Sequence, residues 1–251
     1  YVKRDAYSNE GFGMLYAVNK KFNPNPSFVG RESVEVSYSF LDGPKVELLG
    51  NKEGKFDVDF IDGDTQQVIY STQIGVHHWA KANRRWYTNW EIVVRDKGVE
   101  IEKFKLDLKD KTVLIELESK ALGDTLAWVP YAEEFRKKHG CKVIFKTFWN
   151  QLFKDEYKEI TFIEPGGVFN NVYARYLVGC WDDDEGVFHK RDWRLVGLQQ
   201  IACACLGLEY KEIKPKISIP DLPKNHAKKY VAISEFSTTQ AKQWNRENGW
   251  Q

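Results

Sequence analysis

The hydrophobic pattern of the chain changes at Lys109, and this change constrains the fold more than any other feature of the sequence. From Ser33 to about Leu108, short runs of alternating apolar and polar residues, such as KFDVDFIDGD and QQVIYSTQI, are separated by turn residues. Alternation with a period of two between such turns is typical of β-hairpins. We therefore expect an antiparallel β sandwich or small barrel within residues 1–108, preceded by loops over the first 32 residues.

After Lys109 the sequence alternates between strand-like and helix-like segments. TVLIELE is a nearly continuous apolar run, as expected of a buried parallel strand, and TLAWVPYAEEFRKKHG has helical periodicity up to a capping glycine, Gly140. We expect further strands in KVIFKTF, EITFIEPGG and PKISIP, a short helical segment in NQLFKDEY, and a helix over residues 193–208 that ends at Gly207. This alternation predicts a Rossmann-like domain over residues 109–223.

The last segment, residues 224–251, predicts the start of another Rossmann-like domain. A basic linker leads into KYVAISEFSTTQAKQWN, which has the pattern of a strand, a polar turn and the start of a helix. A lone strand and half a helix cannot bury their apolar faces. We therefore expect this chain to be a fragment of a longer protein, lacking most of its C-terminal domain.

Composition and charge exclude several classes of protein. The 37 basic and 36 acidic residues of the 251-residue chain give a net charge of +1, which disfavours bulk binding of nucleic acid. The sequence contains no run of about 18 uncharged apolar residues, and its first segment does not resemble a secretion signal. We therefore expect a cytoplasmic protein without a membrane span.

The sequence also gives no sign of a metal site. Four cysteines lack the paired short spacings of zinc ligands, and we interpret them as reduced thiols: Cys141, Cys180, Cys203 and Cys205. His77 and His78 are adjacent, so in a strand they would project to opposite faces, and a surface or loop pair is the better interpretation. The acidic run over residues 182–185 is interpreted as a solvated loop.

The loop after TVLIELE is the strongest candidate for chemistry. Ligands of open α/β sheets bind at the carboxyl ends of the strands, where this sequence places Ser119, Lys120, Gly123 and Asp124. Gly123 would allow a close backbone approach, and the carboxylate of Asp124 could act as a general base toward a hydroxyl acceptor. Spacing alone favours a plain helix N-cap for Asp124, so both interpretations stay open.

A second candidate lies in SEFSTTQAKQWN. The hydroxyls of Thr238 and Thr239, the main-chain N–H groups of a helix start and the ammonium of Lys242 would together suit a pyrophosphate. The alternative is that the threonines cap the helix and that Lys242 is a solvated charge.

The pair SKALGDTLAWVPY and FSTTQAKQWN resembles the heptosyltransferases that use ADP-heptose. Together with AWVPYAEEFRKKHGCKV, TFWNQLF, EPGGVFNNVYARY and LQQIACACLGLEYKEIKP, the chain from about residue 35 to its end is similar to the bacterial autotransporter heptosyltransferases, which modify serines of adhesin passengers. The resemblance implies a GT-B fold, with two Rossmann-like domains facing a cleft, and an inverting reaction.

The resemblance also implies roles for particular residues. Asp124 would be the general base for the acceptor serine, with Lys120 and Gly123 supporting its loop, while Thr238, Thr239 and Lys242 would hold the diphosphate of the ADP-heptose donor. The family further implies a homo-oligomer, an adhesin passenger as the acceptor partner, and an iron bound by clustered cysteines in a C-terminal part that this chain lacks. No metal is expected in these 251 residues, and the chain alone is expected to be inactive.

Two other functions remain open from the sequence. The same fold could transfer heptose to lipopolysaccharide or another glycan, or the chain could be a non-catalytic module whose aromatic-rich β part binds a carbohydrate or a partner. Asn caps a helix about as well as Asp. Replacing Asp124 by Asn should therefore abolish an enzyme but leave a binding module intact.

Overall fold

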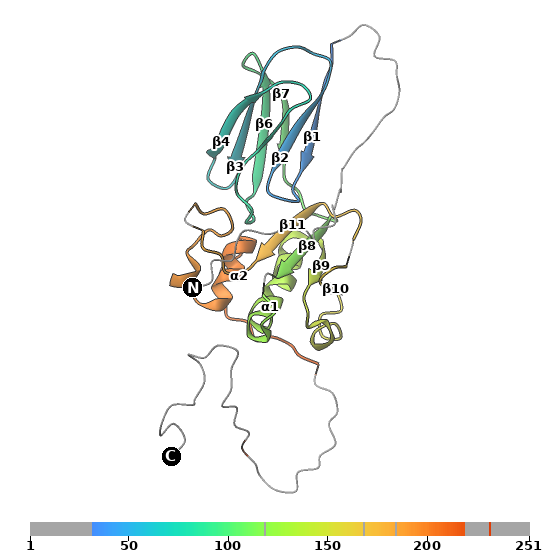
Figure 1. Cartoon of the computed structure of the whole chain (residues 1–251), viewed down its shortest axis with the longest axis vertical. Coiled ribbons are helices and arrows are strands. Elements are labelled where there is room, and N and C mark those ends of the chain that lie inside the picture. The colour runs from blue at the N-terminus through green and yellow to red at the C-terminus, as the bar shows by residue number, and fades with distance from the viewer. Residues whose placement is uncertain (1–31, 118, 168, 184, 219–230, 232–251) are drawn as a thin grey trace. The chain divides into compact units, whose positions relative to one another are not determined.

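The N-terminal part of the chain forms two antiparallel sheets. The computed structural model describes residues 32–117, 119–167, 169–183, 185–218 and 231 (Figure 1). One sheet has the order β1-β2-β5 and contains β1 (Val34–Ser39), β2 (Lys45–Gly50) and β5 (Trp79–Lys81). The other has the order β4-β3-β6-β7 and contains β3 (Phe56–Asp62), β4 (Gln67–Ile74), β6 (Trp90–Asp96) and β7 (Val99–Lys105). Antiparallel sheets were predicted for this region, although the three-residue β5 was not.

The alternation in β3 explains why these sheets pack together. Phe56, Val58 and Phe60 are buried and join one apolar cluster with residues of β2 and β6, including Val46 and Ile92. The intervening Asp57 and Asp59 point to the opposite face of β3, because successive side chains of a strand alternate between faces. There Asp57 accepts a hydrogen bond from Gln73 (2.7 Å), and Asp59 pairs with Ser71 and Arg95. The core of the β part therefore lies between the two sheets.

The second part of the chain is built on a four-stranded parallel sheet. Its strands are β8 (Thr112–Leu117), β9 (Lys142–Lys146), β10 (Ile160–Ile163) and β11 (Ala174–Val178), in the spatial order β10-β9-β8-β11. This order matches the first four strands of a doubly wound sheet, in which the winding direction reverses between the first strand and the fourth. Here that reversal lies between β8 and β11.

Two α-helices follow the strands that flank this reversal. Helix α1 (Leu122–His139) follows β8 and α2 (Leu198–Leu206) follows β11, and the indole N–H of Trp128 donates to the Leu198 carbonyl (2.9 Å) where they pack together. Each ends at a glycine in the left-handed conformation. Two short 3-10 helices are η1 (Asn150–Leu152) and η2 (Trp193–Leu195). None of the helices described is long and apolar enough to cross a membrane.

The β part and the α/β part share one continuous apolar core. Phe40, which follows β1, forms a parallel bridge with Ala174 of β11, and its carbonyl accepts from the Arg175 amide (3.1 Å). The Tyr87 amide donates to the Cys205 carbonyl (2.9 Å), and the Arg85 amide donates to Val187 (2.7 Å). Backbone hydrogen bonds therefore join the two parts at several points, and the predicted boundary at residues 108 and 109 stays a prediction.

The structure corrects three predictions about secondary structure. The helix predicted over residues 193–208 is broken, because η2 ends at Leu195 and α2 begins only at Leu198, after Gly197. Residues 215–218 of the predicted strand PKISIP form no strand, although the Ser218 amide donates to the Leu152 carbonyl (2.9 Å). Strand β11, which borders β8, was not predicted.

Candidate functional site

The carboxyl ends of β8 and β11 form the edge where an open α/β sheet binds ligands. Leu117 pairs with Val178, so the loops that follow these two strands leave from neighbouring positions. Helix α1 starts five residues after the end of β8. The fold rule for doubly wound sheets places a ligand in the crevice between such loops.

Asp124 lies at this edge of the sheet. It occupies the third position of α1, is partly exposed, and makes no side-chain hydrogen bond or ion pair with any described residue. The N-cap is Ala121, which provides no side-chain bond, so the interpretation of Asp124 as the N-cap is wrong. With Asp124 as the N-cap, the helix would start at Thr125, whereas α1 starts three residues earlier, at Leu122. Its carboxylate in the first turn is favoured by the helix dipole.

The loop that leads to Asp124 is held by neighbouring side chains. The Ser119 hydroxyl accepts from the Ala121 amide (3.0 Å), and the Lys120 carbonyl accepts from the indole N–H of Trp149 (2.9 Å). The Lys120 ammonium lies 5.0 Å from the ring centroid of Phe148, which is 41% exposed. Phe148 and Trp149 follow β9, and sequence reasoning missed them, although Phe148 ends the predicted strand KVIFKTF and Trp149 comes directly after it.

Gly123 leaves open space beside Asp124. A Cβ placed on Gly123 would meet no atom within 4 Å, so nothing in the fold itself requires a glycine there. The predicted close approach at Gly123 would therefore have to come from a ligand. The other predicted site residues, Thr238, Thr239 and Lys242, lie outside the described residues.

The loop after β11 is organised by a buried carboxylate. The Asp183 side chain is 4% exposed and accepts hydrogen bonds from the backbone amides of Val187 (2.8 Å), Phe188 (2.6 Å) and His189 (3.3 Å). The His189 ring is also buried, and burial lowers the pKa of its imidazole, while Asp183 acts in the opposite direction. The acidic run was predicted to be solvated, and for Asp183 this is wrong, because three amides take the place of water.

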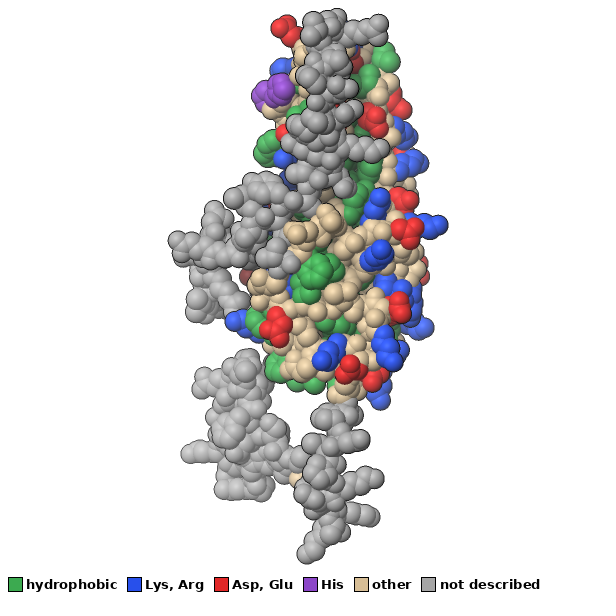
Figure 2. Space-filling view, turned by 90° about the vertical axis from the view of Figure 1, so that its right-hand side faces the viewer, with side chains coloured by type: hydrophobic (Ala, Val, Ile, Leu, Met, Phe, Trp, Pro, Cys, Tyr) green, Lys and Arg blue, Asp and Glu red, His purple; other side chains and the backbone are tan. Residues whose placement is uncertain are grey.

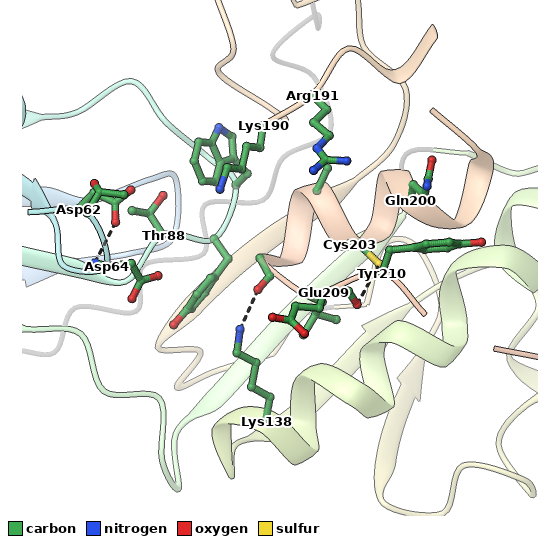
Figure 3. A pocket seen from close by; sticks show the side chains of 16 residues that line it. Asp62, Asp64, Thr88, Lys138, Lys190, Arg191, Gln200, Cys203, Glu209 and Tyr210 are labelled. Atoms are coloured by element: carbon green, nitrogen blue, oxygen red, sulfur yellow. Dashed lines mark hydrogen bonds between the residues drawn. The ribbon is translucent and has the colours of Figure 1, made fainter. Parts of the chain in front are cut away.

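A groove of about 500 Å³ opens at the other edge of the parallel sheet (Figure 3). Helix α1 runs from the carboxyl edge at Leu122 to the amino edge at His139, and Lys138 lines the groove. At 1.5 Å per residue, Lys138 lies about 20 Å along the helix axis from Asp124. The groove is also lined by the turn after β3, the segment 86–88 and residues of α2. It is therefore distinct from the edge that carries Asp124.

Basic and acidic side chains are interspersed over the face shown in Figure 2. In residues 32–218, apart from the three that are not described, no three His, Cys, Asp or Glu side chains come together as a metal site would require. The cysteines Cys141, Cys203 and Cys205 are buried, and burial raises the pKa of each thiol, to about 11, 11 and 12 respectively. His77 and His78 are exposed.

Comparison with known proteins gives consistent matches. No protein-family model matches the sequence. The autotransporter heptosyltransferase TibC of enterotoxigenic Escherichia coli is 30% identical over 230 residues, which are 90% of this chain and 55% of TibC. Aah of Escherichia coli is 31% identical over 221 residues, 85% of this chain and 54% of Aah. BimC of Burkholderia thailandensis, named an inactive autotransporter heptosyltransferase, is 29% identical over 229 residues, 90% of this chain and 53% of BimC.

Solved structures agree with these relatives. The crystal structure of TibC, described as an iron-containing dodecameric glycosyltransferase, matches with a TM-score of 0.78 and 30% identity, over 86% of this chain and 56% of that chain. A structure of TibC in complex with ADP-D-beta-D-heptose matches with a TM-score of 0.77 and 29% identity over the same shares. The chain thus spans about half the length of the relatives it matches.

The fold is an α/β domain preceded by a pair of antiparallel sheets. The chain shares this arrangement with a bacterial glycosyltransferase. Within that class, the chain is a relative of the autotransporter heptosyltransferases, as the resemblance of its sequence motifs indicated.

Proposed function

We propose that the protein to which this chain belongs is an inverting glycosyltransferase of GT-B type. It transfers heptose from ADP-heptose to serine hydroxyls of an autotransporter adhesin. Support comes from the names of the relatives and from the structure of TibC with ADP-D-beta-D-heptose. Because the chain covers about half of each relative, donor, acceptor and activity are all parts of the proposal.

The observation that carries the proposal is the carboxylate of Asp124 at the carboxyl ends of the strands, without a partner among the described residues. The buried Glu116 is held by Lys146 (2.6 Å) and Arg175, whereas Asp124 makes no side-chain hydrogen bond or ion pair with a described residue that would have to break before it acted. A positioned carboxylate can take the proton of an acceptor hydroxyl during its attack. Asp124 is therefore assigned as the general base.

The reaction balances as a single displacement. The serine oxygen forms a bond to the anomeric carbon of heptose from one face, and the bond to ADP breaks on the opposite face, which inverts the configuration. The serine proton passes to Asp124, and the electron pair of the broken bond leaves with the diphosphate. Hydroxyls of Thr238 and Thr239 and the ammonium of Lys242 are proposed to stabilise that charge, while Lys120 and Gly123 shape the loop of the base.

The oligomeric state and the metal content of this protein are inferred only by analogy with TibC. TibC is described as dodecameric and iron-containing, and a homo-oligomer is proposed here on that basis. The residues described in this chain bring no iron ligands together, so they do not fit an iron site, and no step is assigned to iron.

A non-catalytic role is the second candidate, because the relative BimC is described as inactive. Under this alternative, the chain keeps the fold and binds a partner without transferring sugar. The two candidates differ in what Asp124 does.

The test measures the intact mass of an adhesin passenger after incubation with ADP-heptose and the protein expressed from its gene. Wild type should add one or more heptosyl units, and Asp124→Asn should add none while its thermal unfolding is unchanged. The matched control is Asp155→Asn, the same chemical change in an exposed loop, which should retain transfer. Transfer by Asp124→Asn at the wild-type rate would remove the assigned base, and no transfer by a folded wild type would favour the non-catalytic role.

A further inference from the structure

The groove at the amino edge of the parallel sheet is not used by the proposed reaction. Its volume of about 500 Å³ falls within the range of about 300–1,000 Å³ that is usual for small-ligand sites. It lies at the C-terminal end of α1 and along α2, about 20 Å along the α1 axis from Asp124, so a ligand there would not react at Asp124. A ligand bound in this groove would therefore be separate from the groups that react at Asp124.

The charged groups that line the groove balance each other. Three carboxylates, Asp62, Asp64 and Glu209, face three cations, Lys138, Lys190 and Arg191. A diphosphate ligand would need an excess of cationic groups or amides, which this lining does not supply. The ligand that such a lining favours is electrically neutral.

Some of these charged groups are already engaged within the fold. Asp62 lies 3.6 Å from the Arg84 guanidinium, Asp64 accepts from Asn89 (2.9 Å), and Lys138 donates to the Gly207 carbonyl (2.7 Å). The Lys190 ammonium lies 5.9 Å from the centroid of the Trp86 ring. These groups form a fixed, polar wall.

Other groups remain available to a ligand. The side chains of Glu209 and Arg191 make no hydrogen bond or ion pair with any described residue, and they supply an acceptor and a donor at the rim. Tyr210 is 51% exposed, and its ring makes no ring contact within the described part of the chain. The Thr88 hydroxyl is buried in the groove wall without a hydrogen-bond partner among the described residues, and an unsatisfied buried polar atom of a native structure requires an explanation. The groove therefore combines an exposed aromatic face with unsatisfied donors and acceptors of both kinds.

We infer that this groove binds a neutral saccharide, the heptosyl group already attached to an acceptor protein. A sugar presents hydroxyls that both donate and accept, and its C–H face packs on an aromatic ring, which matches Arg191, Glu209 and Tyr210. The identity of the sugar rests on the proposed function, whereas the saccharide class rests on the groove. Binding the product's sugar far from Asp124 would keep a modified adhesin on the protein while further serines react.

The test measures binding of free heptose, and then of a synthetic peptide carrying O-linked heptose, to the 251-residue chain by saturation-transfer NMR and calorimetry. We expect a dissociation constant on the order of 1 mM for the monosaccharide. Tyr210→Ala should weaken binding about tenfold, and Glu209→Gln should weaken it severalfold. Tyr70→Ala is the matched control, because Tyr70 is a 42% exposed tyrosine on β4 that does not line the groove.

Each outcome decides the inference without any sugar transfer being measured. Heptose binding that Tyr210→Ala weakens and Tyr70→Ala does not supports the groove, even if the transfer assay fails. Equal binding by both variants, or no binding by a folded wild type, overturns it. If the unmodified peptide binds as tightly as the heptosylated one, the ligand is a peptide. If ADP binds the wild type and Arg191→Gln abolishes that binding, the ligand is an anion. Either result makes the saccharide assignment wrong.

Discussion

Replacing Gly207 by alanine tests the packing that separates the groove from the core. Gly207 ends α2 with φ +61, and a Cβ there would lie 2.3 Å from Cδ1 of Tyr87. The Tyr87 ring cannot move aside easily, because it packs on Phe135, His139 and Tyr176 with centroid distances of 5.6, 4.6 and 5.8 Å. The left-handed conformation costs alanine about 1 kcal/mol, and forced overpacking costs about 1–3 kcal/mol more. Gly207→Ala should therefore lower the free energy of unfolding by about 2–4 kcal/mol.

Gly140→Ala is the control for the backbone term. Gly140 ends α1 with φ +59, but a Cβ there would meet only Cγ of Lys109, at 3.7 Å. This variant should lose about 1 kcal/mol, so the difference between the two variants isolates the clash with Tyr87. Urea denaturation followed by circular dichroism gives both free energies, with unchanged m-values expected. Equal losses for Gly207→Ala and Gly140→Ala would refute the clash.

Three further predictions concern single residues. Burial, with a smaller contribution from Lys138, lowers the pKa of His139 from 6.5 to about 4. The stability that the neutral ring contributes is therefore present above pH 6.5 and is lost as the pH falls toward 4. His139→Gln should therefore reduce the loss of unfolding free energy between pH 7.5 and pH 4.5 by about 1–2.5 kcal/mol, and the exposed His78→Gln should not, as urea titrations at the two pH values can check. Asp183→Asn should lower the free energy of unfolding by about 2–3 kcal/mol, because an amide nitrogen would face backbone N–H donors. The exposed Asp182→Asn should lower it by less than about 0.5 kcal/mol. Thermal or urea unfolding measures both. Gly123→Ala should raise the melting temperature slightly, because alanine favours a helix by about 1 kcal/mol over glycine. It should also lower heptosyl transfer about tenfold, because the new methyl group would occupy the open space that a substrate fills. Unchanged transfer would show that no ligand approaches there.

Most of the fold could be predicted because the hydrophobic period reports which faces are buried. The strict alternation of β3 and the apolar run of β8 leave little choice about their structure. Strand β11 escaped prediction because Arg175 interrupts the apolar run of ARYLV, and the charge of Arg175 is explained by its ion pair with Glu116 on β8. Such a pairing is visible only after the sheet has formed.

The start of α2 was misplaced for a local reason. WRLVG continues the apolar spacing of the helix that follows it, yet Asp192 caps the Arg194 amide (2.9 Å) and closes a 3-10 turn instead. A new helix then starts after Gly197, whose amide donates to the Gln200 side chain (2.8 Å). Competing side-chain bonds of this kind override periodicity.

The candidate site was predictable in position but not in detail. The rule for parallel sheets located Asp124, whereas the missing cap bond at Ala121 required the structure. The groove could not be predicted, because its lining comes from segments as far apart as Asp62 and Tyr210. Nothing in the local sequence of either segment indicates the other.

The bridge between Phe40 and Ala174 has a consequence for how the chain can be divided. Phe40 occupies part of the free side of β11, so a shortened chain that starts at residue 109 would leave that strand with bare amide and carbonyl groups. Such a piece would be prone to stacking against copies of itself through that bare side. The segment that carries Phe40 is thus needed to cover this part of β11, and because the β part and the α/β part share one apolar core, amide hydrogen exchange in β3 and in β8 should slow and quicken together as one cooperative unit.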